Sequence, residues 1–174
     1  MTDNKQDVYW DACAFLSLLE NSDTDRVPVL QALMDRASIE KDFRIITSII
    51  SITEVAYITS ERDDETSALD FDAIDALWDD REAIYVVEFH EGIARDARSL
   101  MRAVKKQSLE DGGKTLKPAD AIHLATARYA NVSEVNTYDQ FLQTLDHIVG
   151  VEVCEPSGCI QSRLMLESNP QDVE

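Results

Sequence analysis

Short runs rich in β-branched residues alternate along this chain with longer segments of helical periodicity, and this alternation limits the folds open to it. Residues 44–47 and 83–87 are two of the short runs, whereas residues 90–106 repeat apolar side chains at helical spacing. Strands that are separated by helices form parallel sheets with helices on both faces. We therefore predict a single-domain α/β/α sandwich around a mainly parallel central sheet.

The same pattern predicts where the elements lie. Strands are expected at residues 8–10, 44–47, 83–87, 134–137 and 150–154. Helices are expected at residues 12–19, 25–37 (with Asp25 as N-cap), 49–60, 66–79, 90–106 and 118–130. A glycine-containing segment, 107–116, is expected to form a long loop. We expect residues 1–155 to form the domain and residues 156–174 a tail that frays.

The composition is that of an ordinary globular protein. Of 174 residues, 44% are hydrophobic, and no apolar run approaches the roughly 18 residues of a membrane helix. The first residues lack the basic-then-apolar order of a secretory signal. Cys13, Cys154 and Cys159 show no paired spacing, which favours reduced thiols over disulfides. These features predict a cytoplasmic protein without a membrane partner.

The charge is strongly negative but unevenly distributed. The net charge is −18, which disfavours a broad nucleic-acid-binding surface. Residues 61–91 hold 12 acidic side chains and two arginines, whereas residues 92–128 hold eight basic and four acidic side chains. A weak, local and salt-sensitive contact with nucleic acid therefore remains compatible with the composition.

Several common catalytic and cofactor motifs are absent from the sequence. It contains no GxGxxG and no GxxxxGK[ST], which argues against dinucleotide and P-loop nucleotide sites. No nucleophile elbow is present, and the three histidines lack the spacing of a zinc site. Acidic residues near the ends of expected strands are the remaining candidates.

Four acids are expected at one edge of the sheet. Asp11 directly follows the first strand, and Asp139 lies just beyond the fourth. Glu54 lies in the helix after the second strand, and Asp120 in the first turn of the helix that begins at Pro118. Four carboxylates there would repel one another unless a cation neutralised them. Oxygen ligands of this kind suit Mg²⁺ or Mn²⁺.

Four segments that include these acids carry a family resemblance. They are residues 8–16 (VYWDACAFL), 47–55 (TSIISITEV), 117–127 (KPADAIHLATA) and 136–141 (NTYDQF). In this order, they resemble the PIN-domain nucleases, particularly the VapC-like toxin ribonucleases of toxin–antitoxin pairs. The resemblance spans about residues 7–153.

This resemblance implies a function and a set of site residues. Asp11, Glu54, Asp120 and Asp139 would bind Mg or Mn and catalyse endonucleolytic hydrolysis of RNA. Ser48 and Thr137 match polar positions that support these acids in the family. Cys13 departs from the family pattern, which often places Ser, Thr or Asn there. A small antitoxin protein and a homodimer are also implied.

The expected helix 90–106 presents a basic face. Its position beside an acidic metal site favours contact with the RNA backbone over an ordinary solvated surface. The candidate RNA-binding residues are Arg95, Arg98, Arg102, Lys105, Lys106 and Lys117.

Structural alternatives exist for each acid. Asp11 and Asp139 are also typical helix N-caps, Asp120 also suits a helix dipole, and Glu54 could be an exposed helical residue. His123, one turn after Asp120, is more typical of a packed or hydrogen-bonded residue than of a general base. The main alternative function is a PIN-like binding or scaffold protein without useful nuclease activity. A Mg²⁺-dependent phosphatase is less favoured because no DxDx[TV] motif follows the first strand.

Overall fold

Five strands form one parallel sheet at the centre of the structure, a computed structural model that describes residues 6–20, 24–40, 43–57 and 71–156. The order across the sheet is β3-β2-β1-β4-β5, and all four neighbouring pairs are parallel. The prediction of a parallel α/β sandwich is therefore confirmed. The strands are β1 (Gln6–Trp10), β2 (Phe43–Ser48), β3 (Ile84–Val87), β4 (Glu134–Asn136) and β5 (Glu152–Cys154).

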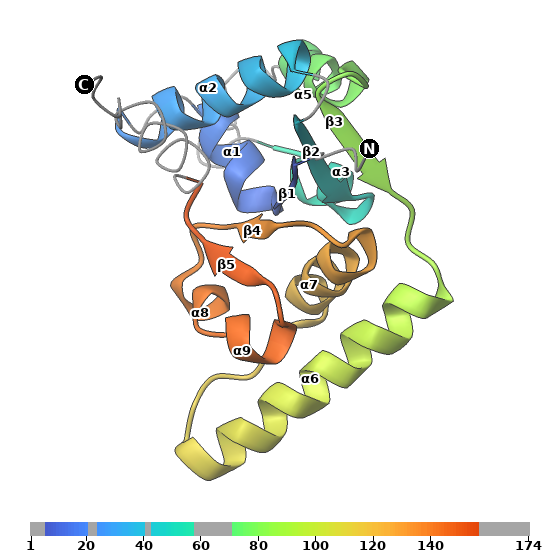
Figure 1. The fold of residues 1–174 in the computed structure, drawn as a ribbon, viewed down its shortest axis with the longest axis vertical. Helices are drawn as coiled ribbons and strands as arrows, with labels where there is room; N and C mark the ends of the chain where they lie inside the picture. The colour runs from blue at the N-terminus through green and yellow to red at the C-terminus, as the bar shows by residue number, and fades with distance from the viewer. Residues whose placement is uncertain (1–5, 21–23, 41–42, 58–70, 157–174) are drawn as a thin grey trace, which may run out of the picture.

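Helices cover both faces of this sheet (Figure 1). One face is covered by α1 (Ala12–Glu20), α2 (Arg26–Ile39) and α5 (Phe71–Asp79). The other is covered by α6 (Glu91–Asp111), α7 (Pro118–Ala130), α8 (Gln140–Gln143) and α9 (Asp146–Val149). A one-turn helix, α3 (Ile50–Glu54), follows β2 at the carboxyl edge.

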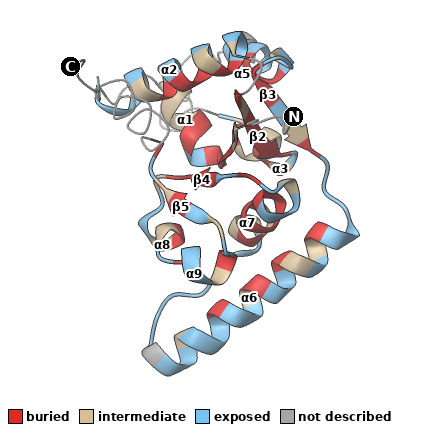
Figure 2. Cartoon of the chain, in the orientation of Figure 1, coloured by how far each residue is buried: buried red, intermediate tan, exposed pale blue. Residues whose placement is uncertain are grey.

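Successive side chains of the central strands point to opposite faces of the sheet, so they are buried in two different hydrophobic cores. Val8 and Trp10 of β1 are fully buried against α1, α2 and α5, whereas Tyr9 between them is fully buried in the core under α6 and α7. Figure 2 shows the buried residues concentrated in the sheet and on the inner sides of the helices. The central strand is thus buried on both faces, and the residue that follows it, Asp11, is held at a fixed position.

The long helix α6 extends further than the sequence predicts. The predicted loop beginning at Gln107 is wrong at its start, because the helix continues to Asp111. Residues 107–111 contain no helix breaker, and Gly112 is the first residue able to take the left-handed conformation, with φ 74°, that ends a helix. No described helix, α6 included, is long and apolar enough to cross a membrane.

Helix α6 runs antiparallel to α7. Arg128 near the end of α7 forms an ion pair of 3.3 Å with Asp96 near the start of α6. The second half of α6 extends towards α8 and α9, and its residues Val104, Gln107 and Ser108 line a pocket together with Phe141, Thr144 and Leu145 (Figure 1).

Other predicted boundaries also need correction or cannot be compared. The helix predicted over 49–60 is only α3, followed by a bend at 55–56, and residues 58–60 lie outside the described part of the chain. The same holds for residues 66–70 of the helix before β3 and for the tail after residue 156. The last strand begins at Glu152 because Gly150, with φ 74°, ends α9.

Candidate functional site

The carboxyl edge of the sheet brings together the segments that hold the four acids. Asp11 follows β1, and its backbone N–H donates to the carbonyl of Asn136, the last residue of β4, at 3.4 Å. Thr137 follows β4 and is bonded through its N–H to Cys154 of β5 at 2.9 Å. Parallel strands end at the same edge, so the residues after them face a common space.

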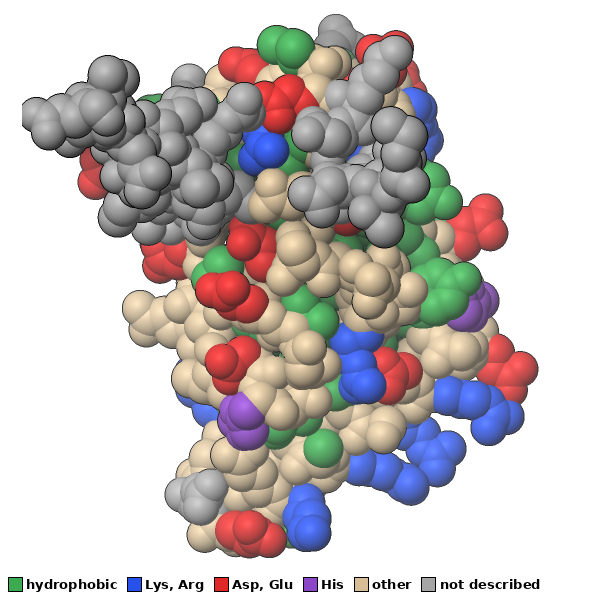
Figure 3. Space-filling view, viewed as in Figure 1, with side chains coloured by type: hydrophobic (Ala, Val, Ile, Leu, Met, Phe, Trp, Pro, Cys, Tyr) green, Lys and Arg blue, Asp and Glu red, His purple; other side chains and the backbone are tan. Residues whose placement is uncertain are grey.

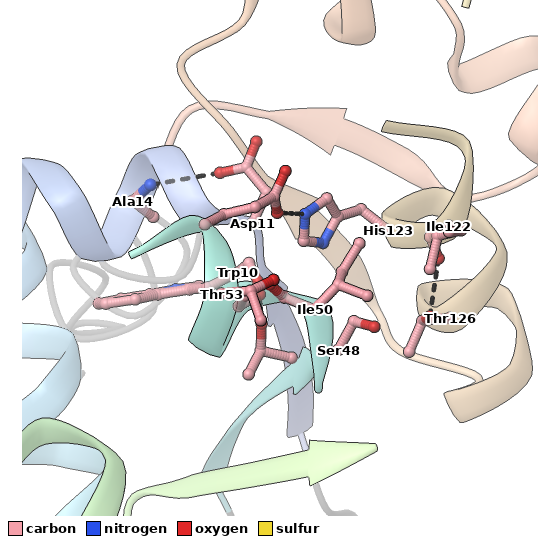
Figure 4. Close-up of polar contacts among 12 residues, drawn as sticks. Trp10, Asp11, Ala14, Ser48, Ile50, Thr53, Ile122, His123 and Thr126 are labelled. Atoms are coloured by element: carbon pink, nitrogen blue, oxygen red, sulfur yellow. Dashed lines mark hydrogen bonds and ion pairs between the residues drawn. The ribbon is translucent and has the colours of Figure 1, made fainter. Parts of the chain in front are cut away.

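Asp11 is the most buried of the four acids, with 4% of its surface exposed. Its carboxylate accepts the backbone N–H of Ala14 at 3.2 Å (Figure 4). Burial raises the pKa of Asp11, while a hydrogen bond from Thr137 and the nearby His123 partly oppose this shift. Asp11 therefore does cap α1, and capping leaves the carboxylate buried at the edge of the sheet.

Asp120 and Asp139 lie nearer to solvent. Asp120 is half-buried in the first turn of α7, and burial raises its pKa; the charges of Asp139 and Glu54 act in the same direction, whereas Lys117 opposes them. Asp139 is exposed and caps α8, accepting the N–H of Phe141 at 2.7 Å. Its own N–H donates to the hydroxyl of Thr137 at 3.0 Å.

Glu54 is the last residue of α3 rather than a residue two turns into a longer helix. Its side chain is one-third exposed, and Oε2 lies 2.6 Å from Nε2 of His123. The predicted alternative of a wholly exposed helical acid is therefore wrong. Ser48 contributes its backbone N–H to the hydroxyl of Tyr9 at 3.1 Å, while its own Oγ is buried with no partner among the described residues.

Sequence reasoning missed one participant, Tyr9. Its hydroxyl lies 2.7 Å from Nδ1 of His123, and the two rings meet edge to face at 5.9 Å. The prediction that His123 is packed and hydrogen-bonded is confirmed, since it is 3% exposed with partners on both ring nitrogens. Tyr9 gave no signal because it lies inside an apolar strand. Figure 4 shows His123 beside Asp11 at the carboxyl edge.

The pKa of the Cys13 thiol is affected by the charges of all four acids. Loss of surrounding water raises its pKa to about 12, and the charges of Asp11, Asp139, Asp120 and Glu54 contribute to this rise in that order. One side chain thus lies within electrostatic reach of all four acids. In the described part of the chain, no lysine or arginine forms a salt bridge with any of them.

The donor chemistry of this site fits a hard divalent cation. All four groups are carboxylates, and the most buried of them, Asp11, forms no salt bridge with a lysine or arginine of the described residues. As the side chains stand, no three His, Cys, Asp or Glu groups of the described residues are close enough together to hold a metal ion. Glu54 is bonded to His123, Asp139 to the start of α8 and Asp11 to the start of α1, so three of the four carboxylates have protein hydrogen-bond partners.

The candidate RNA-binding residues of α6 lie apart from the acids. The buried side of α6 includes Ile93, Ala97 and Val104. A basic stripe, consisting of Arg95, Arg98, Arg102, Lys105 and Lys106, lies on exposed positions of the helix. Figure 3 shows lysine and arginine side chains gathered over α6 at the lower right. Within the stripe, Arg95 is ion-paired with Glu91 at 2.6 Å. Lys117 lies outside the stripe, and its charge lowers the pKa of Asp120.

The fold and the acidic edge define an α/β/α protein with a carboxylate cluster where parallel strands end. A family model described as the PIN domain matches residues 8–148. No curated protein matches the chain significantly in sequence. The match covers most of the chain, and the protein belongs to the PIN domain family.

Solved structures with the same fold come from several bacteria. VapBC-1 from nontypeable Haemophilus influenzae is 16% identical with a TM-score of 0.57, covering 87% of this chain and 99% of that one. FitAcB from Neisseria gonorrhoeae is 17% identical with a TM-score of 0.51 and covers 87% and 99%. VapC20 from Mycobacterium tuberculosis, a sarcin-ricin loop cleaving toxin, is 15% identical with a TM-score of 0.50 and covers 76% and 90%. These likenesses show the shared fold.

Proposed function

We propose that this protein is a metal-dependent endoribonuclease that hydrolyses RNA phosphodiester bonds and acts as the toxin of a toxin–antitoxin pair. The observation that carries this proposal is the placement of four acids at the carboxyl edge of the sheet, where Asp11 follows β1, Glu54 ends α3, Asp120 lies in the first turn of α7 and Asp139 caps α8. Membership of the PIN domain family supports nuclease activity. The description of VapC20 as a toxin that cleaves the sarcin-ricin loop supports RNA as the substrate class.

Asp11, Glu54, Asp120 and Asp139 would hold Mg²⁺ or Mn²⁺ at this edge. A bound divalent cation supplies activation of water and stabilisation of the charge that develops on the phosphoryl group. Thr137 supports two of the acids, because its hydroxyl bonds to Asp11 and accepts the N–H of Asp139. The proposed role of the protein groups is to fix the carboxylates and to keep them ionised.

The RNA backbone would lie across Lys117 and the basic stripe of α6. Lys117 is exposed and caps the start of α7, and its charge opposes the rise in the pKa of Asp120. Arg102, Lys105 and Lys106 are exposed on the second half of α6. Phosphate contacts of this kind position a strand without reading its sequence.

The proposal is tested by incubating the pure protein with total RNA and Mg²⁺ or Mn²⁺. The test variant is Asp120→Asn, and the control is Asp146→Asn, which changes an exposed acid at the start of α9 that is not one of the four proposed ligands. We expect cleavage by the natural protein and the control, and none by Asp120→Asn. Full activity of a folded Asp120→Asn variant would refute the assignment.

A second candidate, a PIN-like binding or scaffold protein without nuclease activity, is favoured by one observation. Glu54 and Asp139 are bonded to protein groups, and the described side chains form no three-ligand metal cluster as they stand. Tight Mn²⁺ binding without cleavage of any RNA would support this candidate. Cleavage that requires Mn²⁺ would exclude it.

A small antitoxin is the proposed partner, together with a second copy of this chain as a homodimer. The solved structures with this fold include VapBC and FitAB assemblies. A basic side chain presented to the acidic edge would neutralise it in the same manner as a cation. Synthetic Arg-containing peptides should therefore inhibit cleavage competitively with Mn²⁺, whereas inhibition independent of Mn²⁺ would contradict this partner chemistry.

A further inference from the structure

Three side chains from separate elements form a continuous hydrogen-bond network at the acidic edge. Tyr9 comes from β1, His123 from α7 and Glu54 from the end of α3. The Tyr9 hydroxyl lies 2.7 Å from Nδ1 of His123, and Nε2 of the same ring lies 2.6 Å from Oε2 of Glu54. The Tyr9–His123–Glu54 network thus connects the central strand to one of the proposed metal ligands.

The position of each hydrogen follows from the chemistry of the partners. Oε2 of Glu54 is an acceptor, so the short contact requires a hydrogen on Nε2 of His123. In a neutral ring this is the only N–H, so Nδ1 is an acceptor and the Tyr9 hydroxyl, which itself accepts the backbone N–H of Ser48 at 3.1 Å, donates its single hydrogen to Nδ1. Together these bonds place the imidazole hydrogen on Nε2 and leave Nδ1 as an acceptor.

The network is buried at Tyr9 and His123 and is exposed to solvent only at Glu54. Tyr9 is 0% exposed and His123 is 3% exposed, whereas the Glu54 side chain is one-third exposed. Burial raises the pKa of Tyr9 well above its usual range, so the phenol keeps the hydrogen that it donates. Glu54 ends a helix of five residues, whose backbone alone gives its side chain little orientation. A buried donor at Nε2 supplies that orientation.

We infer that Tyr9 is a positioning residue, which acts by fixing His123 as the Nε2–H tautomer so that this ring holds one oxygen of Glu54 and leaves the other directed to the acidic edge. This inference rests on the proposed function, because it treats Glu54 as a metal ligand. Hydrogen bonds to ligands commonly govern metal affinity in this way. Neither Tyr9 nor His123 needs to touch the RNA or the reacting atoms.

The first test reads the tautomer directly and needs neither metal nor RNA. Nitrogen chemical shifts of His123 are measured by NMR in metal-free protein, with the His123→Gln variant used to assign the signals. We expect a hydrogen on Nε2 alone in the natural protein, and loss of this fixed tautomer in Tyr9→Phe. The matched control Tyr129→Phe removes the hydroxyl of an exposed tyrosine and should leave the shifts unchanged.

The second test measures Mn²⁺ affinity by calorimetric titration. Tyr9→Phe should weaken Mn²⁺ binding about 10-fold or more, as loss of a group that orients a ligand commonly does. In a Glu54→Gln background, the same change should have no further effect, because Tyr9 acts through Glu54. His123→Gln, which retains a side-chain N–H, should keep more affinity than His123→Leu. Thermal melts confirm that each variant folds.

The outcomes separate this inference from the proposed function. Three results would each overturn the positioning role. The first is a hydrogen on Nδ1 of His123 in the natural protein, and the second is no Mn²⁺ binding by the natural protein. The third is an equal loss of Mn²⁺ affinity from Tyr9→Phe in the natural and Glu54→Gln backgrounds. If the tautomer and the Mn²⁺ cycle are as expected but no RNA is cleaved, the positioning role stands and the nuclease proposal fails.

Discussion

The variant Asp11→Asn separates two effects of the buried carboxylate. These are the loss of stability that its negative charge causes in metal-free protein and its proposed role in binding the metal. Asp11 is 4% exposed, and no lysine or arginine of the described residues pairs with it. Asn keeps an oxygen that can accept the N–H of Ala14 but removes the negative charge. In metal-free protein, the variant should therefore be more stable than the natural chain, although it should be inactive.

The size of the effect follows from the burial. Each unit by which burial raises the pKa of a carboxyl corresponds to about 1.4 kcal/mol. We expect the free energy of unfolding of Asp11→Asn to exceed that of the natural protein, and for a domain of this size each 1 kcal/mol increases Tm by about 2–4 °C. Mn²⁺ at about 100 times its Kd should stabilise the natural protein by about 2.7 kcal/mol and leave the variant unchanged.

Thermal melts with chelator and with Mn²⁺ measure both effects in one series. The order of stability should reverse: Asp11→Asn melts higher without metal and lower with it. Asp75→Asn, an exposed acid on α5, serves as the control and should behave as the natural protein. A Mn²⁺-dependent rise in the Tm of Asp11→Asn, or a metal-free Tm no higher than that of the natural protein, would refute this reasoning.

Three further predictions concern the pH dependence, the core and the basic stripe. Burial raises the pKa of Asp11 in the folded protein, so the folded protein binds a proton at a higher pH than the unfolded protein does. Metal-free stability should therefore rise as the pH falls towards about 4, the ordinary range of an Asp carboxyl, and melts at several pH values should show a flatter slope for Asp11→Asn. Phe15→Ala, which removes a fully buried ring between two tryptophans, should cost about 3–5 kcal/mol in urea unfolding, and a loss under about 1 kcal/mol would contradict its place in the core. A charge-reversal variant combines Arg102→Glu, Lys105→Glu and Lys106→Glu, which are exposed residues of the stripe. It should raise KM for RNA with little change in kcat, and it should reduce the slope of log affinity against log salt concentration by roughly 0.7 for each phosphate that it no longer neutralises. An unchanged KM would contradict the role of these residues.

Much of the fold could be predicted because its local signals agree with its tertiary structure. The β-branched strands are buried on both faces, and Pro118 begins α7 as expected. The errors occur where local signals are weak. Polar residues 107–111 are compatible with helix and with loop, and only the left-handed Gly112 decides between them. Helices as short as α8 and α9 contain too few residues to show a period.

The candidate site could be predicted only in its outline. Topology brings Asp11, Asp120 and Asp139 to one edge because parallel strands end there. The partners of each acid depend on contacts between residues far apart in sequence, such as His123 and Glu54. Tyr9 is the clearest case, since a tyrosine in an apolar strand gives no sign that its hydroxyl meets a histidine 114 residues away.

The central claim is that the acidic edge of the sheet cleaves RNA with a divalent metal. The most direct measurement is single-turnover cleavage of RNA by protein stripped of metal and then supplied with Mn²⁺, for the natural protein and for Asp120→Asn. Our account predicts cleavage by the natural protein only after Mn²⁺ is restored, and no cleavage by the folded variant. Equal cleavage by both proteins, or cleavage that continues in excess chelator, would contradict it.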